Sequence, residues 1–362
     1  MKKVLFVLPH MAGGGAERVT AILANKLIDK GCSVHIHTLV TDESFYNLNS
    51  AIIQTSDGIS VNRKNKASLL LSESLGFIKS FFSVFGLIKK EKFDIVISFF
   101  IETDVIVYLC RLFGCKFTEV HSERNDPWQR SKTFRNVRCH IYKKCDKLIC
   151  QSNAVSEYFD FVPAEKKFVI SNPIDKERIP EKINNHSKRI VSVARLFEQK
   201  NYPLLINSFS LVCEDYPGYT LNIYGDGVLH NQLQELISEL NINDRVFLHG
   251  AKKNVMELIA DAELFVMSSD YEGFPNALLE AMAIGIPVIS TDFKTGIARE
   301  LIKDNNGMVV PVNDVNAMAE AIRKMLSDYE KLLEMGKCNR EKCKRFYTDK
   351  IIDEWIDALS IE

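Results

Sequence analysis

Two carboxylates and a Gly-Phe-Pro corner mark the stretch of this chain that is best equipped for chemistry, residues 268–287, SSDYEGFPNALLEAMAIGIP. Glu272 precedes the glycine of the corner, and Pro275 suits the first turn of a helix predicted over residues 276–284. The N-terminus of such a helix offers free N–H groups and partial positive charge to phosphate or sugar oxygens. Glu280 lies a little over one turn further on, in an otherwise apolar helix. Taken alone, the two acids are equally well explained as solvated surface groups.

Two cations and two further glycine turns can complete a phosphate site. Arg195 and Lys200 follow the apolar segment at residues 189–194, which has the length of a strand. A Gly-Asp-Gly turn at residues 225–227 follows the next such segment. Near the start of the chain, three glycines at residues 13–15 follow the apolar segment at residues 4–8. Cations and helix dipoles neutralise a diphosphate without a metal ion, and a carboxylate deeper in the helix suits a ribose. The three adjacent glycines are a weak signal, because a dinucleotide-binding turn would read Gly-x-Gly-x-x-Gly.

Apolar segments of strand length alternate with helical patterns along the whole chain. In the first half, strands are predicted at residues 4–8, 33–40, 94–100, 117–121, 147–151 and 169–172, and a helix at 16–30. In the second half, strands are predicted at residues 189–194, 220–224, 245–248, 264–267, 287–290 and 308–310, with helices near 203–215, 229–240, 255–260, 276–284, 296–302 and 315–329. This alternation predicts an α/β protein with two doubly wound domains, which the length of 362 residues also suits.

The candidate residues lie where the ligands of such sheets bind. Open α/β sheets bind ligands at the carboxyl ends of their strands, and each candidate directly follows a predicted strand. We therefore expect the two domains to face each other across a cleft. The predicted boundaries are residues 1–172 for the first domain, 173–188 for a polar linker and 189–345 for the second domain.

The charge is unevenly distributed, although the net charge is only −1. Residues 1–170 hold 24 Lys and Arg against 17 Asp and Glu, so this half is basic. A basic half suggests an anionic partner, such as a membrane surface or a phosphorylated acceptor. Two domains of complementary charge would explain the asymmetry equally well.

Two segments of the basic half could meet such a partner. Residues 69–88 predict an amphipathic helix, for which packing in the core is favoured over contact with a membrane surface. Residues 128–147 combine Trp and Tyr with many basic residues, a composition that suits lipid head groups, a pyrophosphate, nucleic acid or a solvated helix face. No recognisable nucleic-acid fold accompanies them, so we do not expect nucleic acid as a partner.

The cysteines predict neither disulfides nor a zinc site. The nine cysteines include no Cys-x-x-Cys pair, and Cys338 and Cys343 have no matching histidine cluster. The apolar run at residues 4–8 is too short for a signal peptide. We therefore expect free thiols in a reducing cytoplasm.

Four segments together carry a family resemblance: SVARLFEQKN, YGDG, FLHG and EGFPNALLEAMAIGIPVIST. They resemble the retaining glycosyltransferases of family GT4, which have the GT-B fold. The most specific part is Glu-x7-Glu, met by Glu272 and Glu280, together with the pair Arg195 and Lys200. The segments LPHMAGGGAERV and VHSERNDP resemble members that assemble bacterial surface polysaccharides and lipid-linked oligosaccharides. The resemblance spans almost the whole chain and is weakest over residues 40–93.

The resemblance implies roles for the residues of the second domain, which would bind the nucleotide sugar. Arg195 and Lys200 would hold the diphosphate, Glu280 the ribose, and Glu272 the donor hexose. Backbone groups of the corner would assist at Gly273, Phe274, Pro275 and Asn276.

The first domain would be the acceptor side. The turn at Gly14 and Gly15 would contact the diphosphate, and His121, at the end of a predicted strand, would lie near the reacting sugar. The C-terminal helix at about residues 346–362 would cross back onto this domain. Basic residues that could meet the acceptor or a membrane are Arg124, Arg130, Lys132 and Arg135.

The implied reaction moves a hexose or N-acetylhexosamine from a nucleoside-diphosphate sugar, with a UDP-sugar favoured, to a saccharide acceptor that is expected to be lipid-linked. Only Glu272 is obviously placed near the sugar, so we expect a same-face displacement rather than a covalent glycosyl-enzyme. Arg195, Lys200, Glu272 and His121 would be the catalytic residues. We expect no metal ion or other cofactor. A cytoplasmic protein is expected, with the inner face of the cell membrane as a candidate place of peripheral attachment.

Other activities remain open from the sequence. A GDP-mannose-type mannosyltransferase or a nucleotide-sugar epimerase would use the same fold. A sugar phosphorylase would need a lysine for pyridoxal phosphate, for which no context is found. A binding protein without catalysis would not need the complete set of two glutamates and two cations. A dinucleotide-dependent oxidoreductase lacks its glycine fingerprint.

Overall fold

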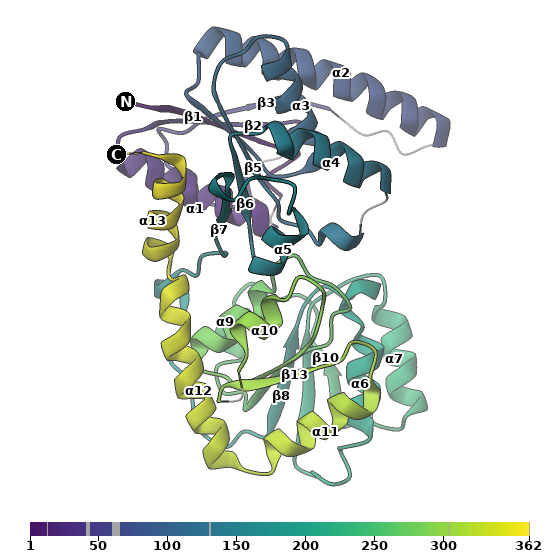
Figure 1. Cartoon of the computed structure of the whole chain (residues 1–362). Coiled ribbons are helices and arrows are strands. Elements are labelled where there is room, and N and C mark those ends of the chain that lie inside the picture. Colours follow the sequence, from purple (N-terminus) through teal and green to yellow (C-terminus); the bar gives the residue numbers. More distant parts are fainter. Residues whose placement is uncertain (13, 41–43, 60–65, 130–131, 304, 362) are drawn as a thin grey trace. The chain divides into compact units, whose positions relative to one another are not determined.

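The computed structural model describes residues 1–12, 14–40, 44–59, 66–129, 132–303 and 305–361. The chain divides into two compact units (Figure 1). Unit 1 comprises Met1–Pro173 and Asp349–Glu362, and unit 2 comprises Ile174–Thr348. The end of the chain therefore belongs to the same unit as its beginning.

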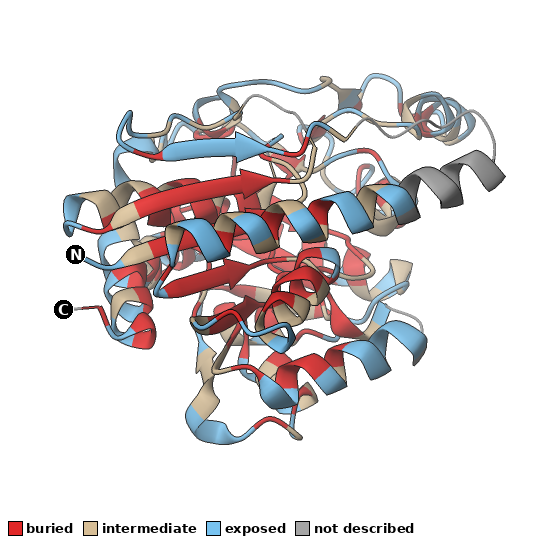
Figure 2. Cartoon of the chain, turned by 90° about the horizontal axis from the view of Figure 1, so that it is seen from above, coloured by how far each residue is buried: buried red, intermediate tan, exposed pale blue. Residues whose placement is uncertain are grey.

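Unit 1 is built on a parallel sheet with the strand order β3-β2-β1-β4-β5-β6-β7. Its strands are β1 (Lys3–Leu8), β2 (Ser33–Thr38), β3 (Ile53–Ser56), β4 (Ile95–Ser98), β5 (Thr118–Ser122), β6 (Lys147–Cys150) and β7 (Lys167–Val169). Its helices are α1 (Gly15–Asp29), α2 (Lys66–Glu91), α3 (Ile101–Leu112), α4 (Lys132–Lys144), α5 (Asn153–Tyr158) and α13 (Thr348–Leu359). Central strands such as β1 and β4 are almost wholly apolar, because helices cover both faces of a parallel sheet. Figure 2 shows the central strands as buried and the helices as alternately buried and exposed.

Unit 2 repeats this architecture with the strand order β10-β9-β8-β11-β12-β13. Its strands are β8 (Arg189–Val193), β9 (Thr220–Tyr224), β10 (Val246–Leu248), β11 (Leu264–Met267), β12 (Val288–Thr291) and β13 (Gly307–Val310). Its helices are α6 (Tyr202–Ser210), α7 (His230–Glu239), α8 (Val255–Leu258), α9 (Asn276–Ile284), α10 (Ile297–Leu301), α11 (Val315–Leu326) and α12 (Tyr329–Cys343). Short 3-10 helices complete the chain: η1 (Pro127–Gln129), η2 (Ala164–Lys166), η3 (Lys176–Arg178), η4 (Glu198–Lys200) and η5 (Lys344–Phe346).

The prediction of two doubly wound sheets is confirmed, and both sheets reverse their strand order at the same relative place. The reversal lies between β1 and β4 in unit 1 and between β8 and β11 in unit 2. Crevices for ligands form at such reversals, at the carboxyl ends of the strands. In unit 2, this is where the loops of Arg195 and Glu272 begin.

The secondary structure differs from the prediction at three elements and at the ends of several others, such as α6, which ends at Ser210 rather than at residue 215. The sequence did not predict β3, α3 or α5, and it placed the strand of β7 at residues 169–172, whereas β7 ends at Val169. All four residues of β3 are exposed, so the strand carries no apolar signal. The pattern of α3 is interrupted by two acids, Glu102 and Asp104, the second of which is buried for a reason given below.

Candidate functional site

The loop that carries Arg195 lies against the glycine turn after β9. A Cβ atom at Gly225 would lie 1.8 Å from the carbonyl oxygen of Ala194, and the φ angle of Gly225 is +151°, which side chains rarely adopt. Only glycine therefore allows the loops after β8 and β9 to approach this closely. Arg195 remains exposed, with its guanidinium carbon 5.1 Å from the ring centroid of Phe197.

Lys200 and Glu272 form an ion pair at the carboxyl ends of β8 and β11, which are neighbours in the sheet. Lys200 Nζ lies 2.5 Å from Glu272 Oε1, and the two side chains are 15% and 8% exposed. The hydroxyl of Ser269 donates to the same oxygen at 2.7 Å. The side-chain amide of Gln199 donates to the carbonyl oxygen of Tyr271 at 2.7 Å. The ion pair is therefore fixed from both sides, by η4 and by the loop after β11.

Asn201 explains why η4 ends where it does. Its φ angle of +43° is left-handed, a conformation that asparagine tolerates better than most residues. Its side chain accepts a hydrogen bond from the N–H of Leu204 and so caps α6, while its Nδ2 donates to Asp270 Oδ1 at 2.7 Å. One residue thus joins η4, α6 and the loop of Glu272.

The Gly-Phe-Pro corner leads into α9 as predicted, and α9 begins at Asn276. The N–H of Asn276 donates to the carbonyl oxygen of Phe274 at 3.0 Å, so this predicted sugar-binding group is already engaged within the corner. Pro275 and Phe274 are buried, and Gly273 and Glu280 are half-buried. The corner therefore carries its own internal hydrogen bond, and Glu280 lies on the first part of α9.

The structure brings Arg195, Lys200 and Glu272 to adjacent strand ends of one sheet, as the sequence predicted for a diphosphate site. It adds Ser269 and Gln199, for which the sequence predicted no role. Their signal is proximity in the chain, because Ser269 lies three residues before Glu272 and Gln199 directly precedes Lys200.

His121 lies in the interior of unit 1. Its Nδ1 is 2.7 Å from Ser98 Oγ and 3.1 Å from Asp104 Oδ1, and its Nε2 is 2.9 Å from Glu119 Oε1. Burial by itself lowers the pKa of the imidazole, but the two carboxylates outweigh it and raise the pKa of His121 to about 9. His121 is therefore a buried imidazolium between two acids. The role beside the reacting sugar stays a prediction, and complete burial argues against it.

The acids around His121 continue into a buried network with α4. The hydroxyl of Tyr142 donates to Asp104 Oδ2 at 2.9 Å and lies 3.3 Å from Glu123 Oε2. Arg138 pairs with the same Glu123 carboxylate at 3.1 Å. Burial raises the pKa of Glu123 above its usual value, although Arg138 opposes this. Arg138 and Tyr142 are one turn apart, so the network fixes one face of α4 against the sheet.

Arg124, predicted to meet the acceptor or a membrane, is also buried. Its Nε donates to Ser122 Oγ at 2.7 Å and its Nη1 to Asn172 Oδ1 at 2.6 Å. The guanidinium lies 5.6 Å from the ring centroid of Phe99 and 5.4 Å from that of Trp355 on α13. Burial lowers the pKa of Arg124 to about 9. These contacts assign Arg124 to the packing of α13 and argue against the predicted surface contact.

Of the other predicted acceptor or membrane residues, the structure describes the side chain of Arg135. Arg135 is exposed on α4, with its guanidinium 5.3 Å from the ring centroid of Tyr158. Arg130 and the side chain of Lys132, which begins α4, lie outside the described part of the chain.

The glycine turn of unit 1 lies at the start of α1, with Gly14 as the N-cap and Gly15 as the first helical residue; the third predicted glycine, Gly13, lies outside the described residues. A Cβ atom at Gly14 would lie 2.3 Å from the carboxylate of Glu17, which is buried. This acid already compensates the positive end of the helix. The predicted contact of Gly14 and Gly15 with a diphosphate stays a prediction.

Within the described residues, no cluster of three or more His, Cys, Asp or Glu side chains has a geometry suited to a metal ion. The nine cysteines are free thiols. Among the helices, over the residues that the structure covers, none has the length and apolar content needed to cross a bilayer.

Comparison with known proteins identifies relatives along the whole chain. Residues 13–178 match the family described as Glycosyltransferase Family 4, and residues 173–342 match Glycosyl transferases group 1. An N-acetylgalactosamine-N,N'-diacetylbacillosaminyl-diphospho-undecaprenol 4-alpha-N-acetylgalactosaminyltransferase of Campylobacter jejuni is 30% identical over 97% of each chain. A second enzyme of that organism, a GalNAc-alpha-(1->4)-GalNAc-alpha-(1->3)-diNAcBac-PP-undecaprenol alpha-1,4-N-acetyl-D-galactosaminyltransferase, is 27% identical over 99% of each chain.

Solved structures show the same fold at lower sequence identity. The sucrose-phosphate synthase of Thermosynechococcus elongatus superposes with a TM-score of 0.81 at 19% identity, covering 99% of this chain and 98% of that one. Anabaena HepE in complex with UDP superposes with a TM-score of 0.78 at 18% identity, covering 99% of this chain and 100% of that one. The family matches and the fold together confirm the resemblance found in the sequence. The chain belongs to the GT4 family of glycosyltransferases, with the GT-B fold, and it is a transferase enzyme.

Proposed function

We propose that this enzyme transfers a hexose or N-acetylhexosamine from a UDP-sugar to a lipid-linked saccharide, with retention of the anomeric configuration. The observation that carries the proposal is the ion pair between Lys200 and Glu272, with exposed Arg195 on the same loop as Lys200. Two cations and one carboxylate at adjacent strand ends are the groups that a diphosphate bonded to a sugar requires.

In the proposed reaction, each group has one task. Arg195 and Lys200 bind the diphosphate and stabilise the charge that develops on it as the bond to the anomeric carbon breaks. Glu272 accepts a hydrogen bond from a hydroxyl of the sugar, which orients the ring. The acceptor oxygen then bonds to the anomeric carbon on the face that the phosphate leaves, and its proton passes to the departing phosphate. No metal ion takes part in this scheme.

The geometry at Glu272 suggests which of its oxygens meets the sugar. Lys200 and Ser269 both contact Oε1, whereas among the residues that the structure describes Oε2 has only a long contact of 3.4 Å with the amide of Gln199. Oε2 therefore retains the greater capacity to accept a hydrogen bond from a ligand.

Relatives support both substrates of the proposal. The two Campylobacter jejuni relatives are named for acceptors linked to undecaprenol through a diphosphate, and for transfer of N-acetylgalactosamine. The solved structure of Anabaena HepE contains UDP. These names make UDP-N-acetylhexosamines and undecaprenyl-diphosphate saccharides the first compounds to test.

The test is a product assay with a panel of UDP-hexoses, UDP-N-acetylhexosamines and GDP-mannose, in the presence of a chelator. Each donor is offered with an undecaprenyl-diphosphate-linked saccharide. We expect product from a UDP-sugar, with the same anomeric configuration as the donor in proton NMR coupling constants. Product from GDP-mannose alone would show that the donor is GDP-mannose and not a UDP-sugar. A product with the inverted anomeric configuration would reject retention. Dependence of the reaction on added Mg²⁺ would reject the metal-free scheme.

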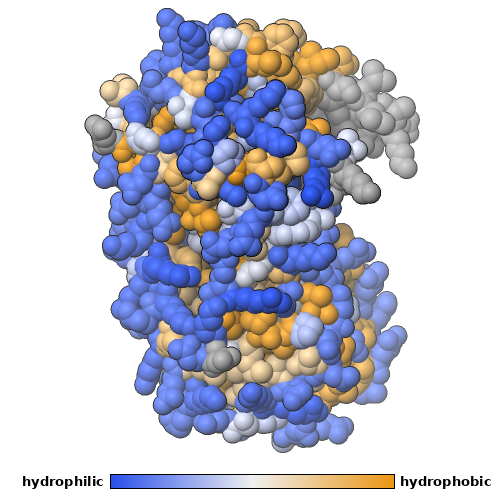
Figure 3. Space-filling view, viewed as in Figure 1, coloured by the Kyte–Doolittle hydropathy of each residue, from blue (hydrophilic) through white to orange (hydrophobic). Residues whose placement is uncertain are grey.

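A lipid-linked acceptor requires access to a membrane, and α2 provides a candidate surface. Leu75, Ile78 and Phe82 follow one face of the helix and are 63%, 51% and 64% exposed. Lys89 and Lys90 continue this face and are exposed. Hydrophobic side chains also gather along α2 in the space-filling view (Figure 3). The opposite face of α2 packs in the core through Val84 and Ile88, as the sequence favoured. We propose that the exposed face in addition attaches the enzyme peripherally to an anionic membrane.

Flotation with liposomes tests this attachment. We expect binding to vesicles that contain anionic lipid, weaker binding at high salt, and loss of binding in Ile78→Glu/Phe82→Glu. Equal binding to neutral vesicles, or no binding to either, would reject it while leaving the product assay unaffected.

A further inference from the structure

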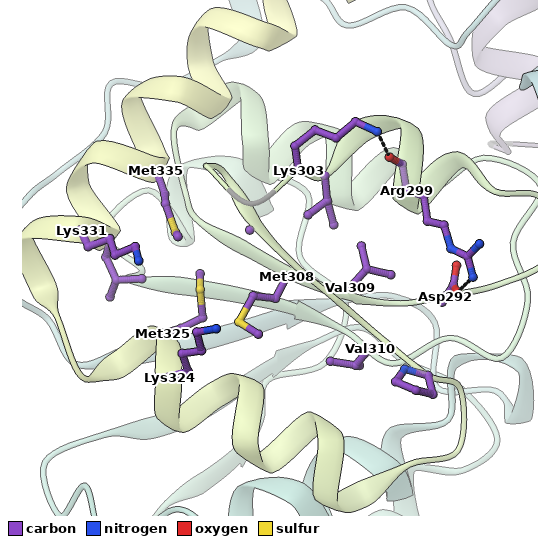
Figure 4. A pocket seen from close by; sticks show the side chains of 14 residues that line it. Asp292, Arg299, Lys303, Met308, Val309, Val310, Lys324, Met325, Lys331 and Met335 are labelled. Carbon is purple, nitrogen blue, oxygen red and sulfur yellow. Dashed lines mark hydrogen bonds and ion pairs between the residues drawn. The ribbon is translucent and has the colours of Figure 1, made fainter.

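A hollow of about 690 Å³ runs along β13 in unit 2, remote in sequence from the donor-site residues. Five consecutive residues, 307–311, line it, together with side chains from α10, α11 and α12 (Figure 4). Successive side chains of a strand point to opposite faces of a sheet. A cavity lined by consecutive residues therefore follows the edge of the strand rather than one face, and we call it the β13 hollow.

The edge of β13 that faces the hollow has unpaired backbone groups. β13 is the end strand of the sheet over the described residues. The carbonyl oxygen of Val310 accepts a hydrogen bond from the N–H of Asp292, so the backbone groups of Val310 face β12. Residues of a parallel strand alternate in the side to which their N–H and C=O point. The N–H and C=O of Val309 therefore point away from β12, toward the hollow, and neither meets a partner within the part of the chain that the structure describes.

Cations surround an apolar floor in the hollow. Met308, Met325 and Met335 form part of the floor (Figure 4). Lys324 and Lys331 line one end and are exposed. At the other end, Arg299 pairs with Asp292, and Lys303 Nζ donates to the carbonyl oxygen of Arg299 at 2.7 Å.

The cations are a local exception in their half of the chain. Residues 171–362 hold 22 Lys and Arg against 30 Asp and Glu. Lysines at a free strand edge can simply prevent unwanted pairing. That explanation leaves the methionine floor without a role, whereas methionine surfaces adapt well to apolar side chains of a partner.

These features select one kind of occupant. A second copy of the chain, paired edge to edge, would bring Lys324 and Lys331 close to their own counterparts and would be repelled. An alkyl chain would leave the N–H of Val309 without an acceptor. An extended peptide supplies backbone acceptors and donors to the edge, apolar side chains to the methionines and carboxylates to the lysines.

We propose that the β13 hollow binds an extended acidic peptide segment of a partner protein, which adds to the free edge of β13 as a short extra strand. The added strand is short because Pro311, directly after β13, has no N–H to donate. This interaction does not depend on the donor site.

The first experiment uses a fluorescein-labelled peptide of alternating Glu and Val, six residues long, and a matched peptide of alternating Lys and Val. Fluorescence anisotropy should show binding of the acidic peptide and not of the basic one. Amide hydrogen exchange of the complex, read by NMR, should slow at Val309 by about tenfold or more. The amide of Met308, which already pairs with β12, should be unchanged.

Two variants test the two kinds of contact. Lys324→Glu/Lys331→Glu should weaken binding of the acidic peptide roughly tenfold. The control is Lys337→Glu, which changes an exposed lysine on the same α12 outside the hollow and should leave binding unchanged. Val309→Pro removes the outward N–H without removing a bond to β12 and should abolish binding, with melting temperature as the check of folding.

Four outcomes of the binding and exchange experiments would overturn the proposal. These are equal binding of both peptides, no binding of either, an unchanged exchange rate at Val309, and binding of decyl phosphate in the hollow in place of the peptide. Dimerisation that Val309→Pro abolishes would also overturn it, since the occupant would then be a second copy.

Discussion

The two units each place a charged cluster at the carboxyl ends of parallel strands, and the two clusters differ in how far solvent reaches them. In unit 2, the side chains of Lys200 and Glu272 are 15% and 8% exposed, and we propose that a ligand replaces part of their mutual contact. In unit 1, His121 lies fully buried between Asp104 and Glu119, and both ring nitrogens are occupied. The unit 2 cluster lies at the strand reversal, after β8 and β11, whereas the unit 1 cluster lies one strand further along, at β4 and β5, and its groups are all engaged with one another.

The difference arises from the elements that cover each strand end. The loop of Glu272 leads to α9 through the Gly-Phe-Pro corner, and it leaves the side chains of Lys200 and Glu272 15% and 8% exposed. The end of β5 is covered by α4, whose Tyr142 and Arg138 reach the acids around His121. A buried ion pair must have all its groups satisfied, whereas a partly exposed pair retains capacity for a ligand.

Substitutions in the unit 2 cluster should have the largest effect of those considered, and this effect should be on catalysis. Arg195→Ala and Lys200→Ala should each lower kcat/KM, with a loss of transition-state stabilisation of about 2–4 kcal/mol, because each removes a charge that stabilises the leaving diphosphate. The measurement is steady-state kinetics with the donor found in the product assay. Their melting temperatures should stay close to that of the wild type, and near wild-type turnover in both variants would contradict the assignment.

Removal of the buried imidazolium should instead cost stability. His121→Gln leaves Asp104 and Glu119 without their cation and should lower the free energy of unfolding by about 3 kcal/mol. Urea denaturation measures the loss. The folded fraction of His121→Gln should retain its turnover. A His121→Gln variant that is as stable as the wild type but inactive would instead indicate a catalytic role for His121.

The raised pKa of His121 predicts a pH dependence of stability in a definite direction. The folded-state pKa of about 9 exceeds the unfolded value of 6.5. The stabilisation is therefore complete below pH 6.5 and is lost as the pH rises through 9, by about 3 kcal/mol in all. Denaturation series across this range should show the decline in the wild type and a flatter profile in His121→Gln. Parallel profiles would show that another group titrates.

Ser269 offers the smallest and most selective change. Its hydroxyl donates a hydrogen bond to Glu272 Oε1, so Ser269→Ala should lower kcat/KM, with a loss of transition-state stabilisation of about 1 kcal/mol. The free energy of unfolding should change little. Ser238→Ala, which removes an exposed hydroxyl on α7, is the matched control and should leave the kinetics unchanged. An equal effect of both substitutions would remove Ser269 from the site.

The sequence predicted the motifs and elements that lie within one segment of the chain. It did not predict the contacts that bring several distant segments together. Arg195 and Lys200 were recognised by their spacing in the sequence, and so were Glu272 and Glu280. The doubly wound sheets followed from the apolar periodicity. The neighbours of His121 come from β4, α3, β5 and α4, so no local pattern announced them. The same reason applies to Arg124, whose burial depends on Trp355, more than two hundred residues later in the chain. Charge at a strand end could be predicted, but its exposure could not.

Calorimetric titration of UDP, with a chelator present, tests the central difference between the two clusters most directly. We predict that wild type and His121→Gln bind UDP with the same affinity, and that Lys200→Met binds at least about tenfold more weakly. Unchanged affinity in Lys200→Met, or a loss confined to His121→Gln, would contradict the assignment of the nucleotide diphosphate to the Lys200 and Glu272 cluster.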